Sequence, residues 1–251
     1  GTTGESATLD FNEHSEVIKT TISIINKRIP VIAGSGANST SEAIELTQKS
    51  KELGADACLL VTPYYNKPTQ NGLYYHYKKI ADEVSIPQIL YNVPGRTSVD
   101  MLPDTVCKLS SHPNIIGIKE ASGDLSRSSE LLEKCSENIL VFTGDDKTSM
   151  RDILMGFDGN ISVTANIAPL EMHNMCVYAK NGDKKNAEII NNKLDTLHDK
   201  LFLESNPIPV KWTLNRMGLI RKGIRLPLTW MDEKFEKSLE VSLFEAGIIS
   251  K

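Results

Sequence analysis

The sequence predicts an α/β protein, a (β/α)₈ TIM barrel that ends in a C-terminal helical extension. Three observations favour this class: apolar strand-length runs alternate with helix-length segments, no glycine-rich phosphate loop is present, and polar side chains gather where strands end. Strands that alternate with helices form parallel βαβ units. The chain of 251 residues, 40% hydrophobic and 24% charged, is long enough for one large domain with a substantial core.

Six apolar strands follow one another along the chain, each ahead of a helix-length segment. The predicted strands are residues 28–36, 55–63, 87–94, 115–122, 139–146 and 159–166. The predicted helices are residues 11–27, 40–53, 70–84, 103–111, 125–135, a short one after 146, 168–181, 183–203, 207–218 and 232–247.

The helix predicted at residues 40–53 carries signals at both ends and along one face. Ser39 or Thr40 can cap its N-terminus, and Gly54 is the residue type that stops a helix. Small and apolar residues recur along one face at helical spacing, at Ala43, Leu46, Ser50 and Leu53.

A doubly wound open sheet is the competing architecture, and it usually carries a glycine-rich phosphate loop. Neither G-x-G-x-x-G nor G-x-x-x-x-G-K-[ST] occurs, and "GSGANST" at 34–40 comes nearest. A barrel instead places its chemistry at the C-terminal ends of several strands. Polar groups follow the predicted strand ends: Thr62, Tyr64, Tyr65, Tyr91, Asn92, Lys119, Glu120, Asp145, Asp146, Thr164 and Asn166. The barrel is therefore favoured.

Eight strands are needed for the barrel and six are visible. The opening "GTTGES" resembles the loop after a strand. We therefore expect the first strand–helix–strand unit, about 30 residues, to be missing. We predict an N-terminally incomplete barrel at residues 1–181 and a helical extension at residues 182–251.

Charge and residue distribution argue against several classes of protein. A net charge of -4 disfavours nucleic-acid binding, and no apolar run reaches the ~18–20 residues of a membrane span. The cysteines and histidines are scattered without metal-ligand spacing, so we expect no metal site, and only ligands that the fold brings together could form one. Separated cysteines without a C-x-x-C pair fit a reducing compartment, and we expect a cytoplasmic protein, or a plastid one in a plant.

Lys119 stands at the end of the otherwise apolar run Ile115, Ile116 and Ile118. A neutral amine attacks carbonyl groups, whereas a solvated lysine at pH 7 is protonated. Burial at the mouth of an apolar barrel lowers the pKa of a lysine, as Schiff-base enzymes require. The alternative is a solvated lysine where a strand reaches the surface.

Schiff-base chemistry needs a proton relay and groups that hold the substrate. Tyr91 ends the preceding strand and can supply a hydroxyl, although it also fits a barrel-lining aromatic. Thr2 and Thr3 can extend the relay or simply cap a helix, and their turn can bind an anion. The guanidinium of Arg96 has paired N–H donors that suit a carboxylate, although Arg96 also fits an ordinary surface arginine.

Five motifs in order resemble the dihydrodipicolinate synthase family of class I pyruvate aldolases, which also include N-acetylneuraminate lyase. They are "GTTGESAT", "VTPYYNKP", "QILYNVPGRT", "IIGIKEASGD" and "NPIPVKW", and the resemblance runs the length of the chain. It implies a lyase without a cofactor, assembled as a homotetramer that is a dimer of dimers.

The resemblance implies that Lys119 forms a Schiff base with pyruvate. The derived enamine would attack aspartate semialdehyde and give 4-hydroxy-tetrahydrodipicolinate, in lysine (diaminopimelate) biosynthesis. Tyr91 would carry protons, and Thr2 would link it to Tyr65, which reaches across a subunit interface. Further residues would hold substrates: Thr3 the pyruvate carboxylate, Arg96 the second substrate, and Gly144 and Ile161 the pocket wall.

Family members under feedback control bind lysine at a dimer interface. The matching positions here are Ser6, Ala7, His14, Asn38, Glu42 and Tyr64. Phe11 stands where lysine-sensitive relatives have a histidine, so the sequence leaves inhibition by lysine open.

Three other functions remain at this stage. N-acetylneuraminate lyases lack an arginine in the motif that holds Arg96. A non-catalytic truncated homologue would keep the residues without the activity. A pyridoxal-phosphate enzyme also uses a strand-end lysine, but its phosphate cradle is not visible in the sequence.

Overall fold

The computed structural model describes residues 1–135 and 137–250. The chain divides into two compact units, the first formed by Gly1 with Leu9–Gly144 and the second by Thr2–Thr8 with Asp145–Lys251. Within the described residues, no helix is both long and apolar enough to cross a membrane.

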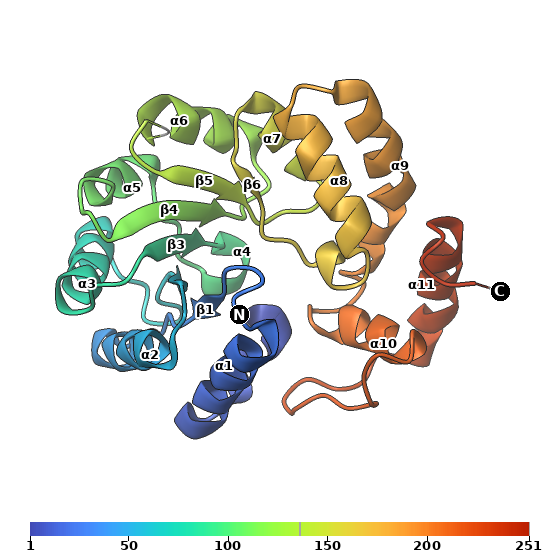
Figure 1. The fold of residues 1–251 in the computed structure, drawn as a ribbon, viewed down its shortest axis with the longest axis horizontal. Helices are drawn as coiled ribbons and strands as arrows, with labels where there is room; N and C mark the ends of the chain where they lie inside the picture. The colour runs from blue at the N-terminus through green and yellow to red at the C-terminus, as the bar shows by residue number, and fades with distance from the viewer. Residues whose placement is uncertain (136, 251) are drawn as a thin grey trace. The chain divides into compact units, whose positions relative to one another are not determined.

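The first unit contains a parallel sheet whose strands pair in chain order (Figure 1). Its strands are β1 (Ile32–Gly34), β2 (Ala57–Val61), β3 (Gln88–Asn92), β4 (Ile115–Glu120) and β5 (Leu140–Thr143). All five residues of β3 are buried, as expected for a strand inside a parallel sheet with covered faces. The carboxyl ends of these strands meet at one edge, where candidate site residues lie.

One helix precedes β1 in the first unit, and the other helices of this unit follow its strands. The helices are α1 (Phe11–Ile25), α2 (Thr40–Leu53), α3 (Gln70–Glu83), α4 (Pro94–Thr97), α5 (Pro103–Leu109) and α6 (Leu125–Cys135). Figure 1 shows α2, α3, α5 and α6 in a row along one side of the sheet. The short α4 was not predicted from the sequence, because "PGRT" carries no helical periodicity.

Local signals set the ends of the helices in the first unit. Ser39 precedes α2, and its side chain accepts a hydrogen bond from the Glu42 backbone at 3.5 Å. Gly54 ends the same helix with φ +96°, a conformation that favours glycine. Both end signals predicted for this helix are confirmed.

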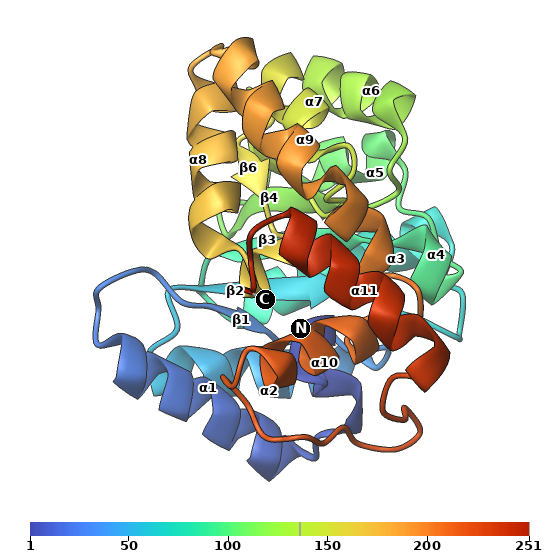
Figure 2. The ribbon, with the colours of Figure 1, turned by 90° about the vertical axis from the view of Figure 1, so that its right-hand side faces the viewer.

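The second unit is mostly helical. It contains α7 (Ser149–Met155), β6 (Gly159–Asn160), α8 (Pro169–Lys180), α9 (Lys184–Lys200), α10 (Ile208–Arg216), α11 (Glu233–Glu245) and 3₁₀ turns at Thr2–Gly4, Ser6–Thr8 and Thr164–Asn166. Figure 2 shows α8 and α9 side by side, and the fully buried Met175, Leu194 and Leu197 come from these two helices. Burial of such side chains is the main stabilising term of this unit.

The strand predicted at residues 159–166 is wrong beyond its first two residues. The carboxylate of Asp146, 2% exposed, accepts hydrogen bonds from the backbone N–H groups of Val163 and Thr164 at 3.0 and 2.9 Å. It also accepts one from Asn160 Nδ2 at 2.9 Å. Because these backbone N–H groups bind the Asp146 carboxylate, they are not available to pair with a neighbouring strand. The segment forms a 3₁₀ helix at Thr164–Asn166 instead.

Six strands are present in the described part of the chain, as predicted, and the α/β class with parallel pairing is confirmed. The closed eight-stranded barrel stays a prediction. The helical segments after residue 168 are also confirmed, with ends that differ by a few residues from the predicted ranges.

Candidate active site at the strand ends

The pairing of β3 with β4 aligns two candidate catalytic residues. Tyr91 is opposite Lys119 in the ladder, and Asn92 is opposite Glu120. Successive side chains of a strand point to opposite faces of the sheet. Tyr91 and Lys119 therefore share one face, and Asn92 and Glu120 share the other.

The Lys119 amine lies over the ring of Tyr91, with 4.2 Å between Nζ and the ring centroid. Tyr91 is 8% exposed and Lys119 is half-buried. The negative face of an aromatic ring attracts an ammonium at this range, which holds the amine in place. The arrangement sets a primary amine beside a phenol, the pair that carbonyl addition with proton transfer requires.

Gly144 follows β5 and lies against the side chain of Lys119. Its N–H donates to the Glu120 carbonyl at 2.7 Å, which continues the ladder beyond β5. A methyl group at Gly144 would collide with the Lys119 methylenes and come within 2.7 Å of Ala121 Cβ. The chain therefore needs a residue without a side chain here for Lys119 to keep its position.

Arg96 and Tyr65 also belong to the first unit. Arg96 is exposed in α4. Tyr65 is 88% exposed and has φ +73°, an unusual conformation for a residue of this type. Its predicted reach into a neighbouring subunit stays a prediction.

Thr2, Thr3 and Ile161 belong to the second unit. Asn206 Nδ2 donates to the Thr3 hydroxyl at 3.1 Å. The turn is also held through Glu5, whose carboxylate accepts from the Lys211 ammonium. Ile161 is half-buried directly after β6.

The residues matched to a lysine site fall in both units. In the first, Asn38 Nδ2 donates to the Tyr64 carbonyl at 3.4 Å. Burial, followed by the negative charge of Glu42, raises the pKa of Tyr64. His14 is buried, with Nε2 2.8 Å from the Gly34 carbonyl, and burial lowers its pKa. Ser6 and Ala7 lie in the 3₁₀ turn Ser6–Thr8 of the second unit.

Sequence reasoning gave no role to Asn92, Glu120 and Arg127, although they form a polar network next to Tyr91 and Lys119. Asn92 and Glu120 are 0% and 3% exposed. The available signal was their position: each directly follows a candidate catalytic residue at the end of a buried strand.

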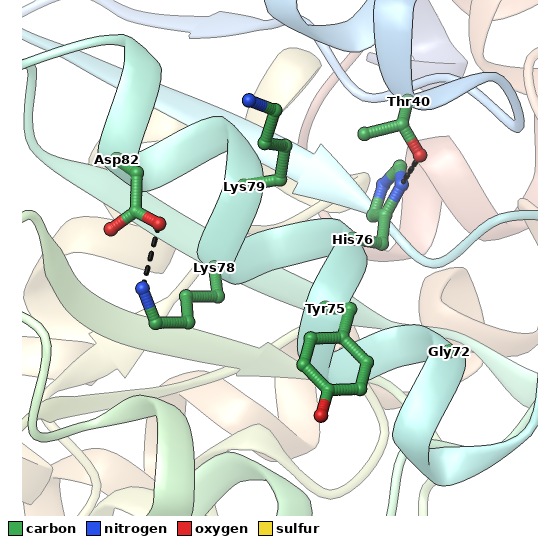
Figure 3. A pocket seen from close by; sticks show the side chains of 7 residues that line it. All are labelled: Thr40, Gly72, Tyr75, His76, Lys78, Lys79 and Asp82. Atoms are coloured by element: carbon green, nitrogen blue, oxygen red, sulfur yellow. Dashed lines mark hydrogen bonds and ion pairs between the residues drawn. The ribbon is translucent and has the colours of Figure 1, made fainter.

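Residues 1–135 and 137–250 contain no cluster of three or more His, Cys, Asp and Glu able to hold a metal ion. A hollow of about 530 Å³ is lined by Thr40, Gly72, Tyr75, His76, Lys78, Lys79 and Asp82 (Figure 3). Lys78 pairs there with Asp82 at 2.7 Å, and the Thr40 hydroxyl lies 2.9 Å from His76 Nδ1. The hollow includes no candidate catalytic residue.

A parallel α/β fold that sets a lysine amine beside a tyrosine phenol at the ends of paired strands is typical of a Schiff-base-forming enzyme. Residues 1–246 match the dihydrodipicolinate synthetase family, and the chain belongs to this family. The family resemblance of the five motifs is confirmed.

Curated relatives and solved structures that are similar to this chain belong to the same family. The 4-hydroxy-tetrahydrodipicolinate synthase of Stutzerimonas stutzeri (strain A1501) is 60% identical over 250 residues, which cover 100% of this chain and 86% of the relative. That of Pseudomonas aeruginosa (strain PAO1) is 58% identical with the same coverage. The chloride-inhibited dihydrodipicolinate synthase of Acinetobacter baumannii, solved with pyruvate, superposes with TM-score 0.98 at 58% identity, over 99% of this chain and 86% of that one.

These matches confirm that the chain is a lyase of this family. They favour the synthase prediction over the N-acetylneuraminate lyase branch and over a non-catalytic homologue, because the curated relatives named as synthases match the chain over its whole length.

Proposed function

We propose that this chain condenses pyruvate with aspartate semialdehyde to give 4-hydroxy-tetrahydrodipicolinate, in lysine (diaminopimelate) biosynthesis. The observation that carries the proposal is the Lys119 amine held 4.2 Å from the centre of the Tyr91 ring, at the ends of two paired strands. The identity of 60% to a relative of that name supports the choice of substrates.

Lys119 is the nucleophile. Its neutral amine adds to the keto carbon of pyruvate, and the carbinolamine loses water to give an iminium. Loss of a methyl proton turns the iminium into an enamine, whose carbon attacks the aldehyde of aspartate semialdehyde. Attack by the substrate's own amine then closes the ring and frees Lys119. Tyr91 gives and takes the protons of these steps, and the position of its ring 4.2 Å from the amine supports this part.

The remaining residues bind and orient the substrates. Thr2 links Tyr91 to Tyr65 of a neighbouring subunit, and the Thr3 turn holds the pyruvate carboxylate. Arg96 binds the carboxylate of aspartate semialdehyde, and its exposure supports a place at the pocket mouth. Gly144 and Ile161 line the pocket, and the space that Gly144 leaves for Lys119 supports its part.

We propose that residues 1–181, with their six strands, form part of a (β/α)₈ barrel and that residues 182–251 form a helical extension, supported by the TM-score of 0.98 to the Acinetobacter baumannii structure. The assembly is a homotetramer, a dimer of dimers. A solved relative, 40% identical with TM-score 0.97, is described as a monomeric variant, so sedimentation has to decide the assembly. The four unpaired cysteines support a reducing compartment, the cytoplasm or, in a plant, the plastid.

A lysine site is proposed at Ser6, Ala7, His14, Asn38, Glu42 and Tyr64. The contact of Asn38 with Tyr64 and the field of Glu42 at Tyr64 support it. The dihydrodipicolinate synthase of Cyanidioschyzon merolae, 38% identical with TM-score 0.95, was solved with lysine bound. Phe11 replaces the histidine of lysine-sensitive relatives, and an activity curve against lysine decides whether binding inhibits.

Steady-state turnover tests the proposed function. The chain is expected to condense pyruvate with aspartate semialdehyde and not with N-acetylmannosamine, the acceptor of the lyase branch. Lys119→Ala and Lys119→Arg are expected to lose the activity, because neither supplies the amine. Turnover by either variant, or a preference for N-acetylmannosamine, would contradict the proposal.

A further inference from the structure

A buried polar network lies behind the two candidate catalytic residues, on the opposite face of the sheet. Asn92 is its centre: its Nδ2 donates to Glu120 Oε2 at 3.0 Å and to Asp100 Oδ1 at 2.9 Å. Its Oδ1 accepts from the Met101 N–H at 2.9 Å. Both amide hydrogens and the oxygen are thus used, so this side chain has one well-defined orientation.

Glu120 is held from three sides. Its Oε1 accepts from the Ser122 N–H at 2.8 Å, while Oε2 accepts from Asn92. The Arg127 guanidinium is 3.9 Å from Oε2. Burial raises the pKa of Glu120, and the hydrogen bonds from Asn92 and Ser122 together with the charge of Arg127 oppose that rise.

Arg127 connects the network to α6. Its guanidinium forms a fork with Asp100, with distances of 2.9 and 2.8 Å to the two carboxylate oxygens. Paired N–H donors on a carboxylate give strong, directional bonds. The network thus ties the ends of β3 and β4 to α6 and to the loop at Asp100.

We propose that Asn92 and Glu120 are positioning residues that hold Tyr91 and Lys119 at the height and spacing the reaction needs. Each of them is the chain neighbour of a candidate catalytic residue, and the bond between them crosses the same strand pair. A shift of one strand end relative to the other would move the phenol away from the amine. Misplacement by about 1 Å can cost an enzyme about 10²-fold in rate. The inference rests on the proposed function, because it assigns a task at that site.

The chain offers a matched control for Asn92. Gln88 is a second buried amide on β3, 0% exposed, at the opposite end of the strand. Its Nε2 donates to the Val84 carbonyl at 3.1 Å. Asn92 makes three hydrogen bonds, two of them to carboxylates, and Gln88 makes one, so Asn92→Ala is expected to destabilise the protein more than Gln88→Ala. A purely structural role of Asn92 predicts that this difference lies in the folded fraction alone, and that kcat per folded molecule is the same in the two variants.

The test compares kcat and KM for pyruvate in wild type, Asn92→Ala and Gln88→Ala, each normalised to the folded fraction from circular dichroism. We expect kcat to fall at least about tenfold in Asn92→Ala, with KM for pyruvate nearly unchanged, and to stay within about twofold in Gln88→Ala. Equal kcat values for the two variants would overturn the inference.

Glu120→Gln covers the case in which Asn92→Ala fails to fold. Glutamine has the same shape but only one acceptor oxygen, so either the Asn92 amide or the Ser122 N–H loses its partner. We expect its kcat to fall as well, and a wild-type kcat would overturn the inference. A wild type that cannot condense the two substrates would instead contradict the proposed function, and the positioning role with it.

Discussion

The side chain of Lys119 fills the space that a side chain at Gly144 would occupy. A methyl group there would also lie 2.7 Å from Ala121 Cβ, closer than real Cβ contacts come. Gly144 and Lys119 end neighbouring strands, so the glycine and the lysine form one packing unit at the candidate site.

Gly144→Ala is expected to displace the Lys119 side chain. Overpacking of this kind costs about 1–3 kcal/mol, and the displaced amine should react more slowly with pyruvate. Thermal unfolding and the rate of borohydride-trapped adduct formation measure the two effects. Gly223→Ala is the control, because a methyl group there meets nothing within 4 Å. Wild-type stability and adduct rate in Gly144→Ala would contradict the packing argument.

Tyr91→Phe is expected to remove the proton carrier while it keeps the ring under the Lys119 amine. Loss of a general acid–base group costs about 10²–10⁴-fold in rate. We therefore expect kcat to fall into this range, with little change in thermal stability or in KM for pyruvate. A Tyr91→Phe variant with the kcat of the wild type would show that another group carries the proton.

Arg96→Ala is expected to weaken the use of aspartate semialdehyde much more than formation of the pyruvate adduct. Arg96 is an exposed residue of α4, so its truncation is expected to leave the packing of the buried strands intact. A lost charge-assisted bond to a carboxylate costs about 1.5–3 kcal/mol, or about 10–100-fold in KM for aspartate semialdehyde. Equal losses for the two substrates would exclude this role.

Because of His76, the folded protein is expected to lose stability as the pH falls below about 6.5. Burial lowers the pKa of His76 from 6.5 to about 4. Between about pH 6.5 and pH 4, His76 is protonated in the unfolded chain but neutral in the folded chain. The free energy of unfolding is therefore highest above about pH 6.5 and falls as the pH is lowered towards 4. Urea unfolding at pH 7 and pH 5 measures this loss. His76→Gln should reduce it, whereas replacement of the exposed His173 should not; identical pH dependence in all three proteins would rule out His76.

The sequence predicted the order of helices and strands well where local signals act. Ser39 and Gly54 bound α2 as expected, and six apolar runs became strands. The segment at 159–166 failed because the buried Asp146 captures its backbone N–H groups, a contact that no periodicity reveals.

The sequence predicted part of the candidate site, namely the pairing of Tyr91 with Lys119, but not the polar network behind these two residues. Tyr91 and Lys119 were paired correctly, since parallel strands place their ends at one edge of the sheet. The network behind them was missed because its members come from β3, β4, α6 and the loop at Asp100, and no local pattern shows that Arg127 and Asp100 meet Asn92 and Glu120. Only the fold shows that they share one set of hydrogen bonds.

The central claim is that Lys119 forms the Schiff base, and reductive trapping tests it most directly. The protein is incubated with pyruvate and sodium borohydride, and intact mass and peptide mapping then locate the product. The account predicts a single reduced pyruvate adduct on Lys119 in the wild type and none in Lys119→Arg. A folded wild-type protein without an adduct, or with its adduct on another lysine, would contradict it.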